Sequence, residues 1–338
     1  MCSTHAHRCK TSGSPCVATN HIWDIGSVDP MVPGHIATEK TFSITHFFNT
    51  HAWFQQLRCA VPGGKLVQSW SLNPMPQHHR SDKLPHLYDR ALMLHGSRRK
   101  EVLTLAEVKR YGLDSFADAD YISIYGMPPE EWYRHGIRVL GRTAVECTRD
   151  ALGDRVGFDV ASVAKRMPAN HFVVIDPFAG SCNTLFWILR HLPNSQGIAF
   201  ESDQQVFALT HRNLAAIGQT IDLIHGEYVT LLEKLRVPRD LGIVAFVAPP
   251  WGTALDEVNG LDLCRTTPPI TEVIDQIARQ FSAHSILFAT QVYERVSAPS
   301  LSDVQTRLDW SDLRIYDINE KGGNHGILLG TRGWAPMQ

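Results

Sequence analysis

Short apolar segments alternate with helical segments over the second half of the chain, and this alternation constrains the fold more than any other feature of the sequence. Continuous apolar runs, without strict polar alternation, are typical of strands that are buried on both faces of a sheet. Five such strands are predicted, over residues 171–175, 197–200, 221–224, 243–247 and 285–289. Helices are predicted between or after them, over residues 185–191, 204–217, 271–281 and 301–308.

Two closing strands complete the predicted sheet. They cover residues 313–316 and 327–330 and are joined by a Gly-rich turn at residues 321–324. Strands that alternate with helices form parallel, doubly wound sheets, and we expect the last two strands to form an antiparallel hairpin. The sequence therefore predicts an α/β fold with a Rossmann-like seven-stranded sheet and an appended N-terminal region.

The N-terminal part of the chain has a different character. Residues 1–40 are rich in His, Ser, Thr, Gly and Pro without periodicity, which predicts an irregular arm. Residues 41–124 are predicted to form an appended α-rich or mixed region, a candidate lid over a substrate, and residues 125–338 the main domain. Helical patterns in these segments cover residues 84–95, 104–111 and 129–152.

Composition narrows the class of protein. The net charge of −2 argues against a strongly basic nucleic-acid binder. No apolar run approaches the ~20 residues that a membrane span needs. The seven Cys residues contain no CxxC pair, so they indicate neither a disulfide framework nor a closely spaced zinc site. We therefore expect a cytoplasmic protein without a bound metal that does not act at a membrane.

The segment between the first predicted strand and the first helix after it carries the first sign of a ligand site. It reads Asp176-Pro-Phe-Ala-Gly180-Ser-Cys-Asn-Thr184, and ligands of doubly wound sheets bind outside the carboxyl ends of the strands. Glu201 ends the second strand, where an acid can accept hydrogen bonds from both ribose hydroxyls of a nucleoside. GxGxxG is absent, and an acid at the end of the first strand would repel a diphosphate. NAD is therefore the second choice of ligand.

This segment resembles the D-P-F-A-G-S-G-N-T loop of class I S-adenosylmethionine-dependent methyltransferases, over about residues 165–335. The resemblance implies S-adenosyl-L-methionine as the cofactor, with Glu201 on the ribose hydroxyls and Gly180 beneath the methionine moiety. Asp176 would orient the loop or meet the amino group through water. The full set of cofactor-binding residues that it implies is Asp176, Phe178, Ala179, Gly180, Asn183, Thr184, Glu201, Ser202 and Glu227.

A further motif, Ala248-Pro249-Pro250-Trp251, directly follows the fourth predicted strand. It resembles the [DNS]-P-P-[YFW] motif of amino-group methyltransferases, and with the next Gly it is similar to the trimethylguanosine synthase group, which methylates the exocyclic nitrogen of a cap guanine. Prolines fix φ at about −65°, so the carbonyl groups of this turn are rigid acceptors for a planar amine. An indole ring stacks on flat ligands, worth about 1–3 kcal/mol. These four residues are the predicted catalytic set, with a positional role.

Two residues depart from the patterns of the family. Cys182 stands where the family usually has Gly, and a Cys at positive φ costs roughly 1–2 kcal/mol. Ala248 stands where Asp, Asn or Ser normally binds the target nitrogen. Either a backbone carbonyl holds the acceptor alone, or the acceptor nitrogen needs no such partner.

Three aromatic or imidazole side chains are candidates for the substrate side. Trp251 would stack on the acceptor. Tyr125 begins the stretch YGMPPEEW, which suits a lid and equally suits the start of a helix. His325 lies between the last two predicted strands and is a candidate general base, although a loop His is more often simply solvated.

Together the motifs predict an S-adenosylmethionine-dependent N-methyltransferase for a planar, nitrogen-containing small molecule, nucleobase-like or heteroaromatic. Two alternatives remain open: an RNA guanine-N2-type methyltransferase, and a non-catalytic scaffold with the methyltransferase fold. The net charge of −2 favours a small-molecule acceptor over RNA, because each phosphate group of a polyanion is bound by a Lys or Arg side chain. The sequence does not predict the oligomeric state.

Overall fold

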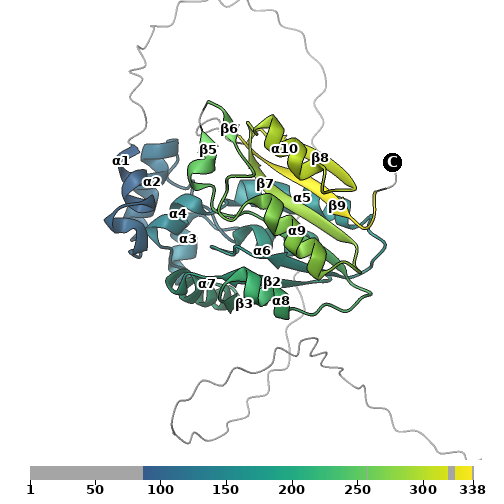
Figure 1. The fold of residues 1–338 in the computed structure, drawn as a ribbon. Helices are drawn as coiled ribbons and strands as arrows, with labels where there is room; N and C mark the ends of the chain where they lie inside the picture. Colours follow the sequence, from purple (N-terminus) through teal and green to yellow (C-terminus); the bar gives the residue numbers. More distant parts are fainter. Residues whose placement is uncertain (1–86, 257, 319–323, 337–338) are drawn as a thin grey trace, which may run out of the picture. The chain divides into compact units, whose positions relative to one another are not determined.

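Seven strands form one central sheet in the computed structural model, which describes residues 87–256, 258–318 and 324–336 (Figure 1). The strands are β1 (Phe172–Asp176), β2 (Ser195–Glu201), β3 (Ile221–His225), β4 (Gly242–Val247), β7 (Ile286–Tyr293), β8 (Trp310–Tyr316) and β9 (His325–Arg332). Their order across the sheet is β3-β2-β1-β4-β7-β9-β8. Strand β9 runs antiparallel to β7 and β8, whereas the pairs from β3 to β7 are parallel. The predicted Rossmann-like α/β sheet is confirmed.

Helices connect the strands and cover both faces of the sheet (Figure 1). They are α6 (Asn183–His191), α7 (Gln204–Ala216), α8 (Tyr228–Lys234), α9 (Ile270–Gln280) and α10 (Ala298–Gln305). Side chains of α8, α9 and α10 join one buried apolar core, and those of α6 and α7 join the other. Strand β1 shows the division: Val173 and Ile175 belong to the first core, and Phe172 and Val174 to the second. Burial on both faces explains why the strands are continuously apolar.

The helices that precede the sheet pack around the second of these cores. They are α1 (Leu87–Leu94), α2 (Leu105–Phe116), α3 (Pro129–Arg134), α4 (Gly141–Glu146) and α5 (Asp150–Ala164), with the 3₁₀ helix η1 (Ser97–Lys100). Trp132 of α3 is fully buried in one apolar cluster with Val108 and Tyr111 of α2. The predicted boundary between residues 124 and 125 therefore falls inside a continuous core. The predicted arm over residues 1–40, and the appended region as far as residue 86, lie outside the described residues.

The helical pattern over residues 129–152 is divided among three helices. Gly136 adopts a φ of 82°, a conformation that ends α3 and favours glycine. The chain then runs extended, and Leu103 N–H donates to Val139 O at 3.0 Å.

Short elements after β4 were not predicted either. They are the 3₁₀ helix η2 (Gly252–Ala254) and the two-stranded β5 (Leu255–Asp256) and β6 (Gly260–Leu261).

Two glycines allow α5 to approach α6 closely. A Cβ atom added at Gly157 would lie 2.6 Å from the carbonyl oxygen of Trp187, and one added at Gly153 would lie 2.6 Å from the Trp187 ring. Backbone contact of this kind leaves no room for a methyl group. The packing holds α6, whose first residue follows the ligand loop, in a fixed place against α5.

We expect Gly157→Ala to lower the free energy of unfolding by roughly 1–3 kcal/mol, because the added methyl group must push the α6 backbone away. A Gly to Ala change in an unobstructed helix would instead gain about 0.5–1 kcal/mol. Urea unfolding followed by circular dichroism measures the difference. Arg155→Ala, at an exposed position of the same helix, is the control and should change stability by less than about 0.5 kcal/mol. A Gly157→Ala protein as stable as the control would contradict the packing.

Candidate functional site

The predicted ligand-binding residues lie at the carboxyl edge of the sheet. Parallel strands end on the same side, so the last residues of β1, β2 and β4 are neighbours there. Strand β9 runs the other way and starts at this edge, where His325 pairs with Tyr293 at the end of β7. The segments that the sequence singled out, although separated by up to 149 residues (176 to 325), therefore come together.

The loop after β1 is tied to the end of β2 by backbone hydrogen bonds. Ala179 N–H donates to Phe200 O at 2.9 Å, and Gly180 N–H donates to a carboxylate oxygen of Glu201 at 3.0 Å. The other Glu201 oxygen accepts the Asp203 N–H at 2.8 Å. Gly180 has a φ of 49°, which glycine adopts without strain. Each carboxylate oxygen of Glu201 therefore keeps a lone pair for another donor.

Two acids face each other at this loop, and both are hard to ionise. Asp176 is only 2% exposed, and burial, with a smaller effect of the Glu201 charge, raises its pKa to about 7 although Phe178 N–H donates to it at 3.0 Å. Burial also raises the pKa of Glu201, against the lowering effect of the Asp203 and Gly180 amides and of Arg142. Partly desolvated carboxylates gain from a cationic ligand, which restores the charge balance.

Cys182 adopts a φ of 56° at the start of α6, the conformation in which the family usually has Gly. Its side chain is 1% exposed and belongs to the apolar core under the sheet. The left-handed backbone costs roughly 1–2 kcal/mol for a residue with a Cβ atom. Packing of the buried thiol offsets part of that cost.

Asn183 and Tyr125 join the ligand loop to the segment before α3. The Asn183 side chain accepts the Tyr125 N–H at 2.7 Å and donates to Thr148 O at 2.7 Å. The Tyr125 hydroxyl donates to Ser181 O, and its ring is 4% exposed. The polar groups of both side chains are thus bonded within the protein, and these bonds hold the ligand loop in place.

The remaining predicted cofactor residues are spread around this loop. Thr184 is buried in the first turn of α6, and Phe178 packs on Tyr228 with ring centroids 5.1 Å apart. Ser202 and Glu227 are exposed, at the ends of β2 and just before α8. Sequence reasoning missed Thr210 of α7, whose hydroxyl donates to Gly180 O at 2.7 Å. No local pattern marks such a residue, since its role depends on how α7 packs.

The Pro-Pro turn after β4 offers free carbonyl groups. Pro250 O accepts the Thr267 N–H at 3.4 Å, and Trp251 O accepts the Ala254 N–H at 2.9 Å. The carbonyl groups of Ala248 and Pro249 accept no hydrogen bond from another described residue. Ala248 is half-buried and Pro249 is buried, so these two carbonyl groups are the acceptors of this turn without a partner among the described residues.

Three rings meet beside this turn. Trp251 and His325 are stacked, with centroids 5.5 Å apart and an interplanar angle of 19°. Tyr293 meets both edge-on, at 6.4 Å from Trp251 and 5.9 Å from His325. Two of the predicted substrate residues are therefore in contact, whereas Tyr125 lies on the cofactor side. Tyr293 was missed, because it joins the group only through the pairing of β7 with β9.

His325 is electrically neutral at physiological pH. Burial lowers its pKa to about 4, and the charges of Arg149 and Arg90 act in the same direction. Its Nδ1 atom is buried and has no hydrogen-bond partner among the described residues. The ring therefore keeps a lone pair and adds no positive charge to the site.

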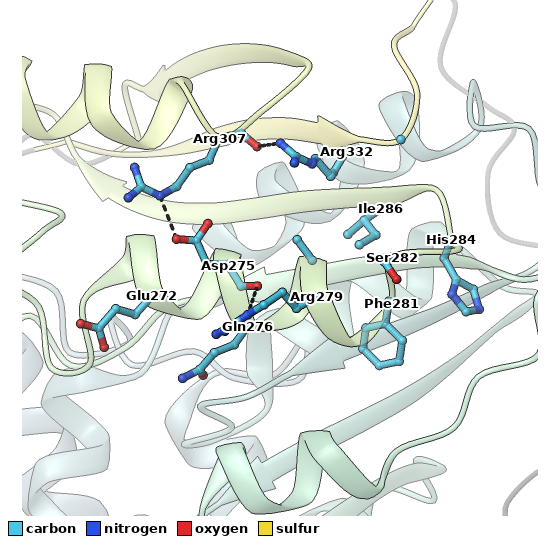
Figure 2. Close-up of a pocket in the computed structure, with 12 residues that line it drawn as sticks. Glu272, Asp275, Gln276, Arg279, Phe281, Ser282, His284, Ile286, Arg307 and Arg332 are labelled. Atoms are coloured by element: carbon cyan, nitrogen blue, oxygen red, sulfur yellow. Dashed lines mark hydrogen bonds and ion pairs between the residues drawn. The ribbon is translucent and has the colours of Figure 1, made fainter.

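A hollow of about 740 Å³ lies at the opposite edge of the sheet, where β7 begins and β9 ends (Figure 2). Two of its arginines are bonded within the hollow. Arg307 binds the Asp275 carboxylate at 3.2 Å, and Arg332 donates to Arg307 O at 2.7 Å. None of the predicted ligand residues lines this hollow, so it is a separate surface feature.

The described residues contain no group of three or more His, Cys, Asp or Glu side chains that could hold a metal ion. Among the same residues, no helix is long and apolar enough to cross a membrane.

Several solved structures with similar chain traces are methyltransferases by name. The chain is 13% identical to a "delta-N METTL16 MTase domain" (TM-score 0.41), covering 67% of this chain and 94% of that one. It is 14% identical to precorrin-6y C5,15-methyltransferase from Geobacter metallireducens (TM-score 0.36; 55% and 89%). It is also 14% identical to an rRNA methylase from Streptococcus thermophilus (TM-score 0.35; 52% and 94%). No family model and no curated protein matches the sequence. With TM-scores below 0.5, function rests on the chain's own residues.

We expect Asp176→Asn to change how stability depends on pH. The folded-state pKa of about 7 lies above the ordinary value of 3.8, so the folded protein holds this proton more tightly than the unfolded chain does. The wild-type contribution is therefore fully favourable at low pH and is lost as the pH rises to about 7. Between pH 4 and pH 8 the variant should gain roughly 2–4 kcal/mol relative to the wild type.

Urea unfolding at a series of pH values measures this difference, since Asn keeps an oxygen that can accept the Phe178 N–H. Asp222→Asn, at an exposed position of β3, is the control and should leave the pH profile unchanged. Parallel profiles for wild type and Asp176→Asn would show that Asp176 ionises normally.

Proposed function

We propose that the protein binds S-adenosyl-L-methionine at the carboxyl edge of β1 and β2 and catalyses N-methylation of a planar, nitrogen-containing small molecule. The observation that carries the proposal is the convergence of two sets of groups on one edge of the sheet. Partly desolvated acids lie at the ends of β1 and β2, and a rigid Pro-Pro-Trp turn with free carbonyl groups lies at the end of the neighbouring β4.

The cofactor half suits a cationic nucleoside. The free lone pairs of Glu201 would accept the ribose hydroxyls, while its bonds to the Gly180 and Asp203 amides hold the carboxylate in place. Asp176 lies behind the loop and favours the ammonium and sulfonium charges of the ligand electrostatically. When bound, the cofactor supplies an electrophilic methyl group on sulfur, and the protein supplies position and charge.

The acceptor half suits a flat amine. The Ala248 and Pro249 carbonyls would accept its N–H groups, so that the nitrogen lone pair points away from them toward the methyl donor. Trp251 would stack on the ring of the acceptor. Because Ala248 has no side-chain acceptor, only backbone carbonyl groups of this turn would accept the N–H groups of the amine.

His325 would receive the proton that a methylated nitrogen must lose. Its pKa of about 4 makes it a weak base, but the ring is neutral and its lone pair is available at pH 7. A cationic ring at this place would repel the methyl donor. The low pKa therefore allows His325 to accept a proton without carrying a charge that repels the methyl donor.

An RNA guanine remains the second candidate acceptor, because the turn would hold a guanine amino group equally well. The small molecule is favoured by the net charge of −2 of the chain. The scaffold hypothesis draws on Cys182 and Ala248. Against it, the loop that contains Cys182 is held by the Phe178, Ala179 and Gly180 N–H groups, which donate to Asp176, Phe200 and Glu201.

We expect Glu201→Ala to weaken binding of S-adenosylhomocysteine at least about tenfold, because a charged hydrogen-bond acceptor is worth about 1.5–3 kcal/mol. Isothermal titration calorimetry measures the affinity, and a melting curve confirms that the variant is folded. Glu233→Ala, an exposed acid on α8, is the control. Equal affinity for the two variants would refute the role of Glu201, and binding of NAD in place of S-adenosylhomocysteine would refute the cofactor.

We expect Trp251→Ala to raise the KM for the acceptor about fivefold or more and to lower turnover, because the loss of one stacked ring removes about 1–3 kcal/mol. The affinity for S-adenosylhomocysteine should stay unchanged. Methyl transfer from radiolabelled cofactor to a metabolite extract and to total RNA measures the effect. Phe158→Ala removes an aromatic ring that is 58% exposed on α5 and is the control. Labelling confined to RNA would exclude the small-molecule acceptor.

A further inference from the structure

A half-buried arginine without an acidic partner among the described residues lies at the same edge of the sheet as the rings of Trp251, Tyr293 and His325. Arg149 precedes α5, and its Nη2 donates to Ile318 O at 3.0 Å. Its guanidinium lies over the ring of Tyr121, 4.4 Å from the centroid. No described carboxylate lies within ion-pair distance of it. A charge that is partly removed from water without a counter-ion is unfavourable until an anion binds.

Several independent contacts place Arg149 at this edge of the sheet. The preceding Thr148 donates its hydroxyl to Gln291 of β7 at 3.1 Å, two residues before Tyr293. Ile318 follows β8, whose last residue pairs with His325. The lowered pKa of His325, to which the Arg149 charge contributes, agrees with this placement.

Arg149 is held so that it can bind an anion with two donors. Ile318 O accepts one of its five N–H groups, and none of its nitrogen atoms is buried without a partner. The cation–π contact with the Tyr121 ring, 4.4 Å from the guanidinium carbon to the ring centroid, helps to hold the side chain in place. A planar guanidinium binds a carboxylate or a phosphate through two parallel hydrogen bonds.

We propose that the acceptor is a small planar molecule with an anionic substituent, a carboxylate or a phosphate, which Arg149 binds while the ring of the acceptor lies on Trp251. The inference rests on the proposed function and names the class of its substrate. Arg149 is thus a specificity-determining residue that sequence patterns did not mark.

Neighbouring charges permit this role. Arg90 of α1 is exposed and has no ion-pair partner among the described residues, so it adds positive potential at the same place. The nearby acid is Glu294, which accepts the Asn324 N–H at 2.9 Å and lies 3.9 Å from Arg295. Its negative charge is therefore partly compensated. At His325 the charges of two arginines, Arg149 and Arg90, therefore act against that of one carboxylate, Glu294.

The test separates a radiolabelled metabolite extract on an anion exchanger after methyl transfer by the full-length protein. Label is expected in a retained, anionic fraction, and Arg149→Gln should raise the KM for that fraction about tenfold or more, with Arg149→Lys in between. Affinity for S-adenosylhomocysteine should not change. Arg239→Gln, at an exposed position near the amino end of β4, is the matched control and should behave as wild type.

Three outcomes overturn the inference. Label in a neutral or cationic fraction shows that the acceptor carries no anionic group, and label confined to RNA shows that it is not a small molecule. An Arg149→Gln protein that matches Arg239→Gln shows that Arg149 does not bind it. Absence of any label, with S-adenosylhomocysteine still bound, refutes the proposed transfer reaction, and the inference is then lost with it.

A second measurement does not depend on turnover. The pKa of His325, followed by NMR and assigned with a His325→Gln protein, should rise in Arg149→Gln because a cation that faces the ring is removed. Inorganic phosphate added to the wild type should also raise it, but not in Arg149→Gln. If the pKa is the same in both proteins and insensitive to phosphate, Arg149 is not placed as proposed.

Discussion

The hydrogen bond between the Gly180 amide and the Glu201 carboxylate fixes the geometry on which the rest of the site depends. It ties the turn after β1 to the end of β2, with a second bond from Ala179 N–H to Phe200 O. Burial raises the pKa of both acids at this place, and the Glu201 charge raises that of Asp176 further. The fold thus maintains an electrostatic cost at one place, and a cationic ligand is the chemistry that relieves it.

The carboxyl edge of the sheet carries acids at the ends of β1 and β2 and an arginine on the side of β7. This difference in charge would decide which ligand binds on which side. Asp176 and Glu201 form the acidic half, whereas Arg149 and a neutral His325 form the other. A cationic methyl donor and an anionic acceptor would each prefer their own half, which keeps the two reactants from exchanging places. The Pro-Pro turn of β4 lies beside β1, where the two halves meet.

Much of the fold could be predicted because its determinants are local. Continuous apolar runs mark strands that are buried on both faces, and the motifs at their ends mark the edge that binds ligands. Contacts that depend on strand register or on helix packing have no local sequence pattern from which they could be predicted. Tyr293 meets His325 only because β9 pairs with β7, and Arg149 lies at this edge because Thr148 bonds to Gln291. The pattern over residues 129–152 was read as one helix because its apolar spacing continues across Gly136, whose φ of 82° ends α3.

The departures at Cys182 and Ala248 bear on whether the site is catalytic, and the structure separates their effects. The strain at Cys182 is confined to the backbone of one residue, and its side chain points into the apolar core that supports the loop. The loop before it is held by hydrogen bonds of Phe178 and Gly180 to Asp176, Glu201 and Thr210. At Ala248 a side-chain acceptor is missing, yet two rigid carbonyl groups remain free in the same turn. An acceptor held by carbonyl groups alone must present N–H donors to them, and a ring nitrogen without hydrogen cannot do so. Given the proposed reaction, an exocyclic amino group is therefore a better acceptor for this turn than a bare ring nitrogen.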